Sequence, residues 1–226
     1  MSAKAKTKIA KTKLLIVDDH PMMRQGLALL INEEPDLTVC GEAGDAAQAM
    51  AAVAASKPDL VLADVSLGGK SGLELVKDLQ ALHPGLPVLI ISMHDESIYA
   101  ERVLRAGARG YIMKQEGGKK MLQAIRHILA GQIYVSEKMS ALILEIFSGS
   151  RARGSRSPVQ QLTDREFEVF QLIGAGKGTR EIAERLHLSV KTVEVHRIHI
   201  KEKLQLTTGS EVIRYAVRWV ESQGNG

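Results

Sequence analysis

The chain has 226 residues, a length that favours two domains, and its content of 45% hydrophobic and 25% charged residues is that of a globular protein. No apolar run reaches the roughly 20 residues of a membrane span. One cysteine, Cys40, excludes an intrachain disulfide and a thiolate metal cluster. The net charge of +4 is unevenly divided, since residues 14–150 carry 12 Lys/Arg against 17 Asp/Glu and residues 151–226 carry 13 against 9, so the basic second part is expected to meet nucleic acid.

The first 13 residues contain five lysines and no acidic residue. They lack the apolar core of a secretory signal, so the sequence predicts a cytoplasmic protein. The simpler interpretation of this leader is a solvated, disordered tail. An auxiliary contact with a polyanion is the alternative.

Short apolar runs alternate with helical patterns from residue 13 to residue 131. The runs have the length and composition of strands and cover residues 14–17, 37–40, 60–63, 88–91 and 111–113. The helical patterns stop at or before a glycine or proline and cover residues 22–33, 46–56, 73–82, 95–106 and 119–130. This alternation predicts an α/β fold in which helices cover both faces of a doubly wound parallel sheet.

Five polar residues stand at or just after the ends of these apolar runs: Asp18, Asp19, Asp64, Ser92 and Lys114. The carboxyl ends of parallel strands share one edge of a sheet, so we expect these side chains to gather there. Three neighbouring carboxylates need a cation, and a hard ion such as Mg²⁺ suits oxygen ligands. The lysine and the serine would bind phosphoryl oxygens, and Asp64 is the candidate nucleophile because a carboxylate can accept a phosphoryl group.

These residues and their surroundings resemble the receiver domain of bacterial response regulators. The matching segments are Val17-Asp18-Asp19-His20, Asp64-Val65-Ser66-Leu67, Ser71-Gly72, Ile91-Ser92-Met93-His94-Asp95 and Gly110-Tyr111-Ile112-Met113-Lys114. The resemblance implies a (βα)₅ fold in which a partner histidine kinase phosphorylates Asp64. It assigns Mg²⁺ to Asp19, Asp64 and the backbone oxygen of Ser66, with Asp18 acting through water, and it makes Ser92 and Tyr111 a switch pair. One departure is Gly68, which stands where the family usually has proline and predicts a looser loop.

After residue 131 the sequence changes character. Residues 136–147 predict one more helix, and residues 148–158, which lack large apolar side chains, predict a flexible linker. From residue 162 onward only helical periodicity remains. Thr163 and Glu166 form a capping-box pattern, and Ser189 can cap a helix that starts at Val190. Two short helices across a tight turn suggest a small all-α helix-turn-helix domain.

The helix after Ser189 has two distinct stripes. Val193, His196, Ile200 and Leu204 share the face predicted to pack inward, and His196 is interpreted as a core or cap histidine. The opposite stripe is predicted to face the major groove, and it consists of Lys191, Glu194, Val195 and Ile198. Phosphate contacts are expected from Thr192, Arg197 and Lys201.

These C-terminal segments closely resemble the LuxR-type DNA-binding domain, and both halves together resemble the NarL/FixJ class of response regulators. The resemblance implies a receiver at residues 13–131, a helix and linker at 132–161, and a DNA-binding domain at 162–226. It also implies dimers on promoter DNA through a last helix at about 210–220, where Trp219 could belong to the core or to the partner contact.

The sequence therefore predicts a transcription factor switched by phosphorylation rather than an enzyme. One alternative is a regulator whose receiver is a phosphorylation-independent interaction module. The other is an Asp-nucleophile phosphatase, which usually needs a second acid two residues after the nucleophile, where this chain has Ser66.

Overall fold

The computed structural model describes residues 11–67, 71–93, 96–137, 139–141 and 158–224. The chain divides into two compact units, Met1–Ser136 and Glu137–Gly226, and each is described by itself. Several expectations lie outside the described residues: most of the leader, the loop at Gly68, most of the helix expected at 136–147, and the linker up to residue 157.

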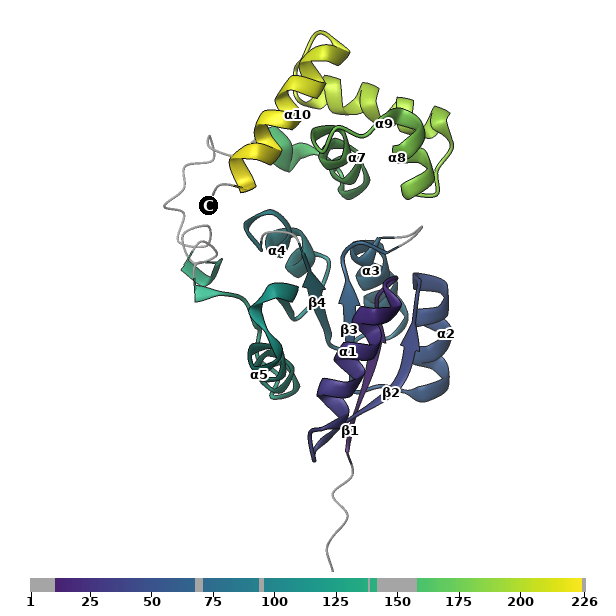
Figure 1. The fold of residues 1–226 in the computed structure, drawn as a ribbon, viewed down its shortest axis with the longest axis vertical. Coiled ribbons are helices and arrows are strands. Elements are labelled where there is room, and N and C mark those ends of the chain that lie inside the picture. The colour runs from purple at the N-terminus through teal and green to yellow at the C-terminus, as the bar shows by residue number, and fades with distance from the viewer. Residues whose placement is uncertain (1–10, 68–70, 94–95, 138, 142–157, 225–226) are drawn as a thin grey trace, which may run out of the picture. The chain divides into compact units, whose positions relative to one another are not determined.

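The first unit contains a five-stranded parallel sheet (Figure 1). Its strands are β1 (Thr12–Val17), β2 (Leu37–Ala43), β3 (Leu60–Asp64), β4 (Val88–Ser92) and β5 (Gly110–Met113). They lie in the order β2-β1-β3-β4-β5. Because β1 pairs with both β2 and β3, the chain reverses direction across the sheet at β1, which is the doubly wound topology predicted from the sequence.

Helices alternate with the strands, as the sequence predicted. They are α1 (Pro21–Asn32), α2 (Ala46–Ser56), α3 (Gly72–Leu82), α4 (Glu96–Arg105) and α5 (Gly118–Leu129), with a short 3₁₀ turn η1 (Lys114–Glu116) after β5. The predicted ends differ by about one residue. At α1 the difference arises because Pro21 begins the helix, where the missing N–H costs no hydrogen bond.

The sheet is buried on both faces. The residues of β3 and β4 are all buried, as are the last four of β1. Alternate side chains of the strands pack against α1 and α5 in one core cluster, and α2, α3 and α4 cover the other face (Figure 1). Burial on both sides explains why these strands are continuous apolar runs without polar alternation.

The second unit is helical in its described residues from 158 to 224. Its elements are η2 (Pro158–Gln161), α7 (Asp164–Gly174), α8 (Thr179–Arg185), α9 (Val190–Lys203) and α10 (Gly209–Gly224). Thr163 and Glu166 form the predicted capping box at the start of α7.

Aromatic side chains of α7 and α10 form the centre of this unit. The ring of Trp219 meets Phe167 edge-on at 5.5 Å between centroids and Phe170 at 5.6 Å. Trp219, whose place the sequence left open, therefore packs against the core of its own unit while its side chain stays half-buried. Among the described residues, no helix has the length and apolar character needed to cross a membrane.

Candidate functional site

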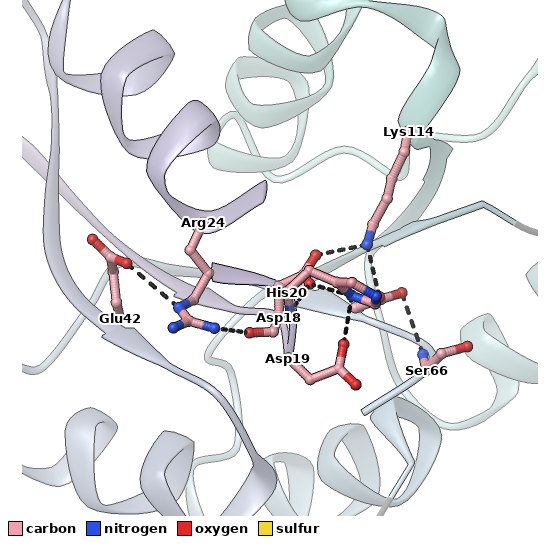
Figure 2. A network of polar contacts seen from close by, with 8 residues as sticks. Asp18, Asp19, His20, Arg24, Glu42, Ser66 and Lys114 are labelled. Carbon is pink, nitrogen blue, oxygen red and sulfur yellow. Dashed lines mark hydrogen bonds and ion pairs between the residues drawn. The ribbon is translucent and has the colours of Figure 1, made fainter. Parts of the chain in front are cut away.

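Four strands of the first unit bring the predicted site residues to one edge of the sheet. Asp18 and Asp19 follow β1, Asp64 ends β3, Ser92 ends β4, and Lys114 follows β5. The parallel register makes these ends coincide, since Asp64 lies opposite Ile91 and Ser92 lies opposite Met113. Figure 2 shows the side chains from β1 and β5 converging there.

Lys114 joins two of the carboxylates. Its Nζ donates to Oδ2 of Asp18 at 2.6 Å and to Oδ2 of Asp64 at 2.7 Å, and all three side chains are almost fully buried. These contacts link residues up to 96 positions apart in the chain. We call Asp18, Asp19 and Asp64, together with Lys114, the acidic site.

The electrostatics of the acidic site favour an additional cation. Burial raises the pKa of Asp64, although its hydrogen bond with Lys114 opposes the shift. Burial would lower the pKa of Lys114, but its hydrogen bonds to Asp18 and Asp64 outweigh this and raise it. One ammonium faces two buried carboxylates and an exposed third, Asp19, so negative charge remains in excess.

The donor set fits a metal ion. Asp18, Asp19, His20 and Asp64 each offer a ligand atom, and these atoms lie within 4.8 Å of one another. Most of them are carboxylate oxygens, which hard divalent cations prefer. Ser66 lies beside this group, because its backbone N–H donates to Oδ1 of Asp64 at 3.2 Å.

Two neighbours of the acidic site were not predicted. His20 places Nδ1 at 2.6 Å from Asp19 Oδ1 and 3.2 Å from Asp18 Oδ1. Arg24 donates from Nη1 to the backbone oxygen of Asp18 at 2.5 Å, and its Nε lies 3.5 Å from Glu42 (Figure 2). Because His20 directly follows the two aspartates in the sequence, its place beside the acidic site could have been predicted. Nothing in the local sequence indicates the contacts of Arg24.

The predicted switch residues are both buried within the sheet. Ser92 and Tyr111 are almost inaccessible to solvent. Tyr111 lies opposite Ile90, two pairs before the edge at Ser92 and Met113. Its backbone N–H donates to the carbonyl of Tyr134 at 2.9 Å. The ring therefore lies inside the receiver fold, behind the edge that holds the acidic site.

In the second unit, α8 and α9 form the predicted helix-turn-helix. The turn contains His187 with a positive φ of 51°, and the Leu188 N–H bonds back to the Ala183 carbonyl at 2.8 Å. The side chain of Ser189 accepts from the Thr192 N–H at 3.0 Å, which caps α9 as predicted.

The two faces of α9 lie as the periodicity predicted. Val193, Ile200 and Leu204 are buried, whereas the side of the helix that carries Lys191 and Glu194 is exposed. Val195 is 41% and Ile198 51% exposed, although both are apolar.

Four further residues predicted for DNA contacts or the core also have defined places on α9. Thr192 is half-buried at its start, Lys201 is half-buried near its end, and Arg197 donates to the hydroxyl of Thr179 on α8 at 3.4 Å. His196 is half-buried, and burial lowers its pKa. The contacts of α9 residues with DNA stay a prediction.

The comparisons with known proteins cover both units. The family described as "Response regulator receiver domain" matches residues 14–126, and "Bacterial regulatory proteins, luxR family" matches residues 160–216. The oxygen regulatory protein NreC of Staphylococcus carnosus (strain TM300) is 36% identical over 91% of this chain and 97% of its own. NreC of Staphylococcus aureus (strain JH9) is 38% identical over the same shares.

Solved structures agree with these matches. A LuxR-family two-component response regulator from Aurantimonas sp. SI85-9A1 is 33% identical over 62% of this chain and 99% of its own, with a TM-score of 0.57. RcsB of Salmonella enterica serovar Typhimurium, bound to promoter P1flhDC with a phosphomimetic, covers 92% of this chain and 98% of its own with a TM-score of 0.64. Its 22% identity supports the fold alone.

A receiver fold with an acidic site at its sheet edge is thus followed by a helix-turn-helix unit, and relatives above 30% identity share nearly the whole length. The chain belongs to the two-component response regulators that join a receiver domain to a LuxR-type DNA-binding domain, and it is a DNA-binding transcription regulator rather than an enzyme.

Proposed function

We propose that Asp64 is the phosphoacceptor of this regulator and that a sensor histidine kinase is its phosphodonor. The observation that carries the proposal is the buried contact of Lys114 with both Asp18 and Asp64 at the sheet edge. A carboxylate beside an ammonium that can hold phosphoryl oxygens supports this assignment.

The proposed transfer of the phosphoryl group from the donor to Asp64 needs no further reactant. An oxygen of Asp64 attacks the phosphorus atom of the donor, the bond from phosphorus to the donor breaks, and the freed donor takes up a proton. Mg²⁺, when bound, neutralises charge on the phosphoryl oxygens. Its proposed ligands are Asp19, Asp64 and the backbone oxygen of Ser66, with Asp18 reached through water.

After transfer, Lys114 holds the phosphoryl group and the hydroxyl of Ser92 donates to it. Phosphorylation adds about two negative charges. In the proposed switch, Ser92 moves toward these charges and Tyr111 follows, so that the receiver shifts between two states. The receiver is assigned to residues 13–131, the connecting helix and linker to 132–161, and the DNA-binding domain to 162–226.

We propose that the switch controls a homodimer on double-stranded promoter DNA. The exposed Val195 and Ile198 on α9 are the candidates for thymine methyl contacts, with Lys191 and Glu194 beside them. On α10, Val212 and Ala216 face the core, whereas Ile213 is exposed and available to a partner. A function on promoter DNA also supports the cytoplasmic location expected from the sequence.

The experiment for this function compares genomic DNA bound by the purified chain with and without acetyl phosphate and Mg²⁺. Phosphorylation is expected to raise the dimer fraction, measured by sedimentation, and the occupancy of a defined set of sites. Identical dimerisation and identical occupancy in both conditions would favour the phosphorylation-independent alternative.

Replacing Arg197 with alanine is expected to weaken binding to all DNA sequences alike. If this guanidinium contacts a phosphate, its loss makes the slope of log K against log salt shallower by about 1. Fluorescence anisotropy over a range of salt concentrations measures both quantities.

The matched control is Arg105→Ala, which removes the same charge from an exposed position on α4 of the receiver. It should leave the salt slope unchanged. An Arg197→Ala slope equal to that of the wild type would remove Arg197 from the phosphate contacts.

A further inference from the structure

Three side chains of the DNA-binding unit place two imidazoles beside a carboxylate, far from the acidic site in the sequence. Glu166 lies in the first turn of α7, and His196 and His199 lie one turn apart on α9. Each offers a ligand atom, and the three atoms lie within 4.8 Å of one another. We call these residues the Glu-His-His cluster. It joins two helices that are separate in the sequence.

The two carboxylate oxygens of Glu166 have different partners. Oε2 accepts from the Thr163 N–H at 2.7 Å and from Lys203 Nζ at 2.6 Å. Oε1 faces His199 Nδ1 at 3.6 Å, which is too long for a hydrogen bond. Capping of α7 and the ion pair with Lys203 therefore engage one oxygen and leave the other turned toward the imidazoles.

His196 provides a second, independent observation. Its Nδ1 is buried and has no hydrogen-bond partner among the residues that the structure describes. Buried polar atoms in native proteins nearly always have a partner, which can be a protein group, a water or an ion. An ion bound through Nδ1 of His196 would supply this missing partner.

We propose that Glu166, His196 and His199 form a site for a divalent transition ion, with Zn²⁺ as the ion that fits best. Two imidazole nitrogens and one carboxylate oxygen are a known three-ligand set for zinc, in which water takes the fourth position. Mg²⁺, by contrast, prefers oxygen ligands. The i, i+3 spacing of the two histidines directs both rings to the same side of α9.

Zinc binding requires only a local adjustment. Bonds of about 2.0–2.2 Å bring ligand atoms to roughly 3–3.5 Å from one another, whereas the atoms of the cluster lie within 4.8 Å of one another and Oε1 of Glu166 is already 3.6 Å from His199 Nδ1. His199 can move because its side chain is 50% exposed. The Lys203 ion pair remains in place, because it uses the other oxygen of Glu166.

The bound ion would fix α9 to α7. Because α9 carries the exposed residues Val195 and Ile198, the ion would stabilise the helix that presents the proposed DNA-binding stripe. An ion that binds the folded state but not the unfolded state stabilises the fold by an amount that grows with the logarithm of the ion concentration above Kd, and it raises the melting temperature accordingly. Zinc is therefore expected to raise the unfolding temperature of this unit, independently of phosphorylation at Asp64.

The test uses the full-length chain, freed of metal with a chelator and kept in excess Mg²⁺ so that the acidic site is saturated. Calorimetric titration with Zn²⁺ is expected to show a site that weakens at least about tenfold in His199→Asn. Co²⁺ in place of Zn²⁺ should give visible absorption bands that disappear in the same variant. Circular dichroism checks that the variant remains helical.

The matched control is His187→Asn in the turn before α9. His187 is exposed and has a positive φ, which asparagine tolerates well, and this variant should bind Zn²⁺ like the wild type. The proposal is overturned if the wild type binds no Zn²⁺ under these conditions. Equal affinity in His199→Asn and the wild type, or equal losses in both variants, would overturn it as well.

Discussion

Asp64→Ala is expected to abolish labelling of the chain by acetyl phosphate in the presence of Mg²⁺, whereas the wild type is labelled. The carboxylate of Asp64 is the one whose oxygens contact both Lys114 and the Ser66 N–H. Its removal deletes the proposed nucleophile. Mass spectrometry of the intact protein would measure the added phosphoryl group, and chelation of Mg²⁺ should also remove the labelling.

The matched control is Asp59→Ala, which removes a carboxylate just before the other end of β3. Asp59 accepts a hydrogen bond from the Lys13 N–H and takes no part in the acidic site. This variant should be labelled like the wild type. Persistent labelling of Asp64→Ala would contradict the site assignment, and a wild type that no phosphodonor labels would contradict the switch itself.

Gly72→Ala is expected to destabilise the receiver by about 4 kcal/mol or more, which is exceptional for the addition of one methyl group. A Cβ on Gly72 would lie 2.1 Å from the backbone oxygen of Asp64 and 2.9 Å from the Cα of Val65. The Gly72 N–H also donates to the Val65 carbonyl at 2.8 Å. The obstacle is therefore backbone, which cannot move without displacing Asp64.

Calorimetry can measure this effect because the variant changes only the receiver, so the transition of the DNA-binding unit should stay in place. Gly26→Ala is the matched control, since a Cβ there meets nothing within 4 Å and the residue lies inside α1. That substitution should stabilise the receiver by about 0.5–1 kcal/mol. Equal stabilities of the two variants would show that the loop after β3 relaxes freely.

The sequence predicted the receiver fold and the gathering of acidic residues at the sheet edge because this information is local at each strand end, and the roles of these residues stay predictions. β1, β3 and β4 each contain an apolar run, and a parallel sheet necessarily brings the residues after those runs to one edge. Helix starts were also predictable where a capping side chain bonds to a backbone N–H three residues away, as at Thr163 and Ser189.

Side-chain contacts between separate helices and strands could not be predicted from the sequence. Arg24 bonds to the backbone oxygen of Asp18, and Trp219 packs against Phe167 and Phe170, but both contacts depend on how separate elements are oriented. The Glu-His-His cluster shows the same limit. The inward position of His196 followed from helical periodicity, whereas its proximity to Glu166 depends on the packing of α7 against α9.

The separation of Asp18 and Lys114 along the chain has a consequence for the protein during its synthesis. The two aspartates after β1 are made early, but the ammonium that lies between Asp18 and Asp64 is added only after β5, 96 positions later. A fragment that ends before β5 would bring like charges together without a counter-charge, and pairing of distant strands is slow. Under the proposed function, a chain that ends before β5 lacks Lys114 and is not expected to accept a phosphoryl group, so phosphorylation would require that the whole sheet has been made.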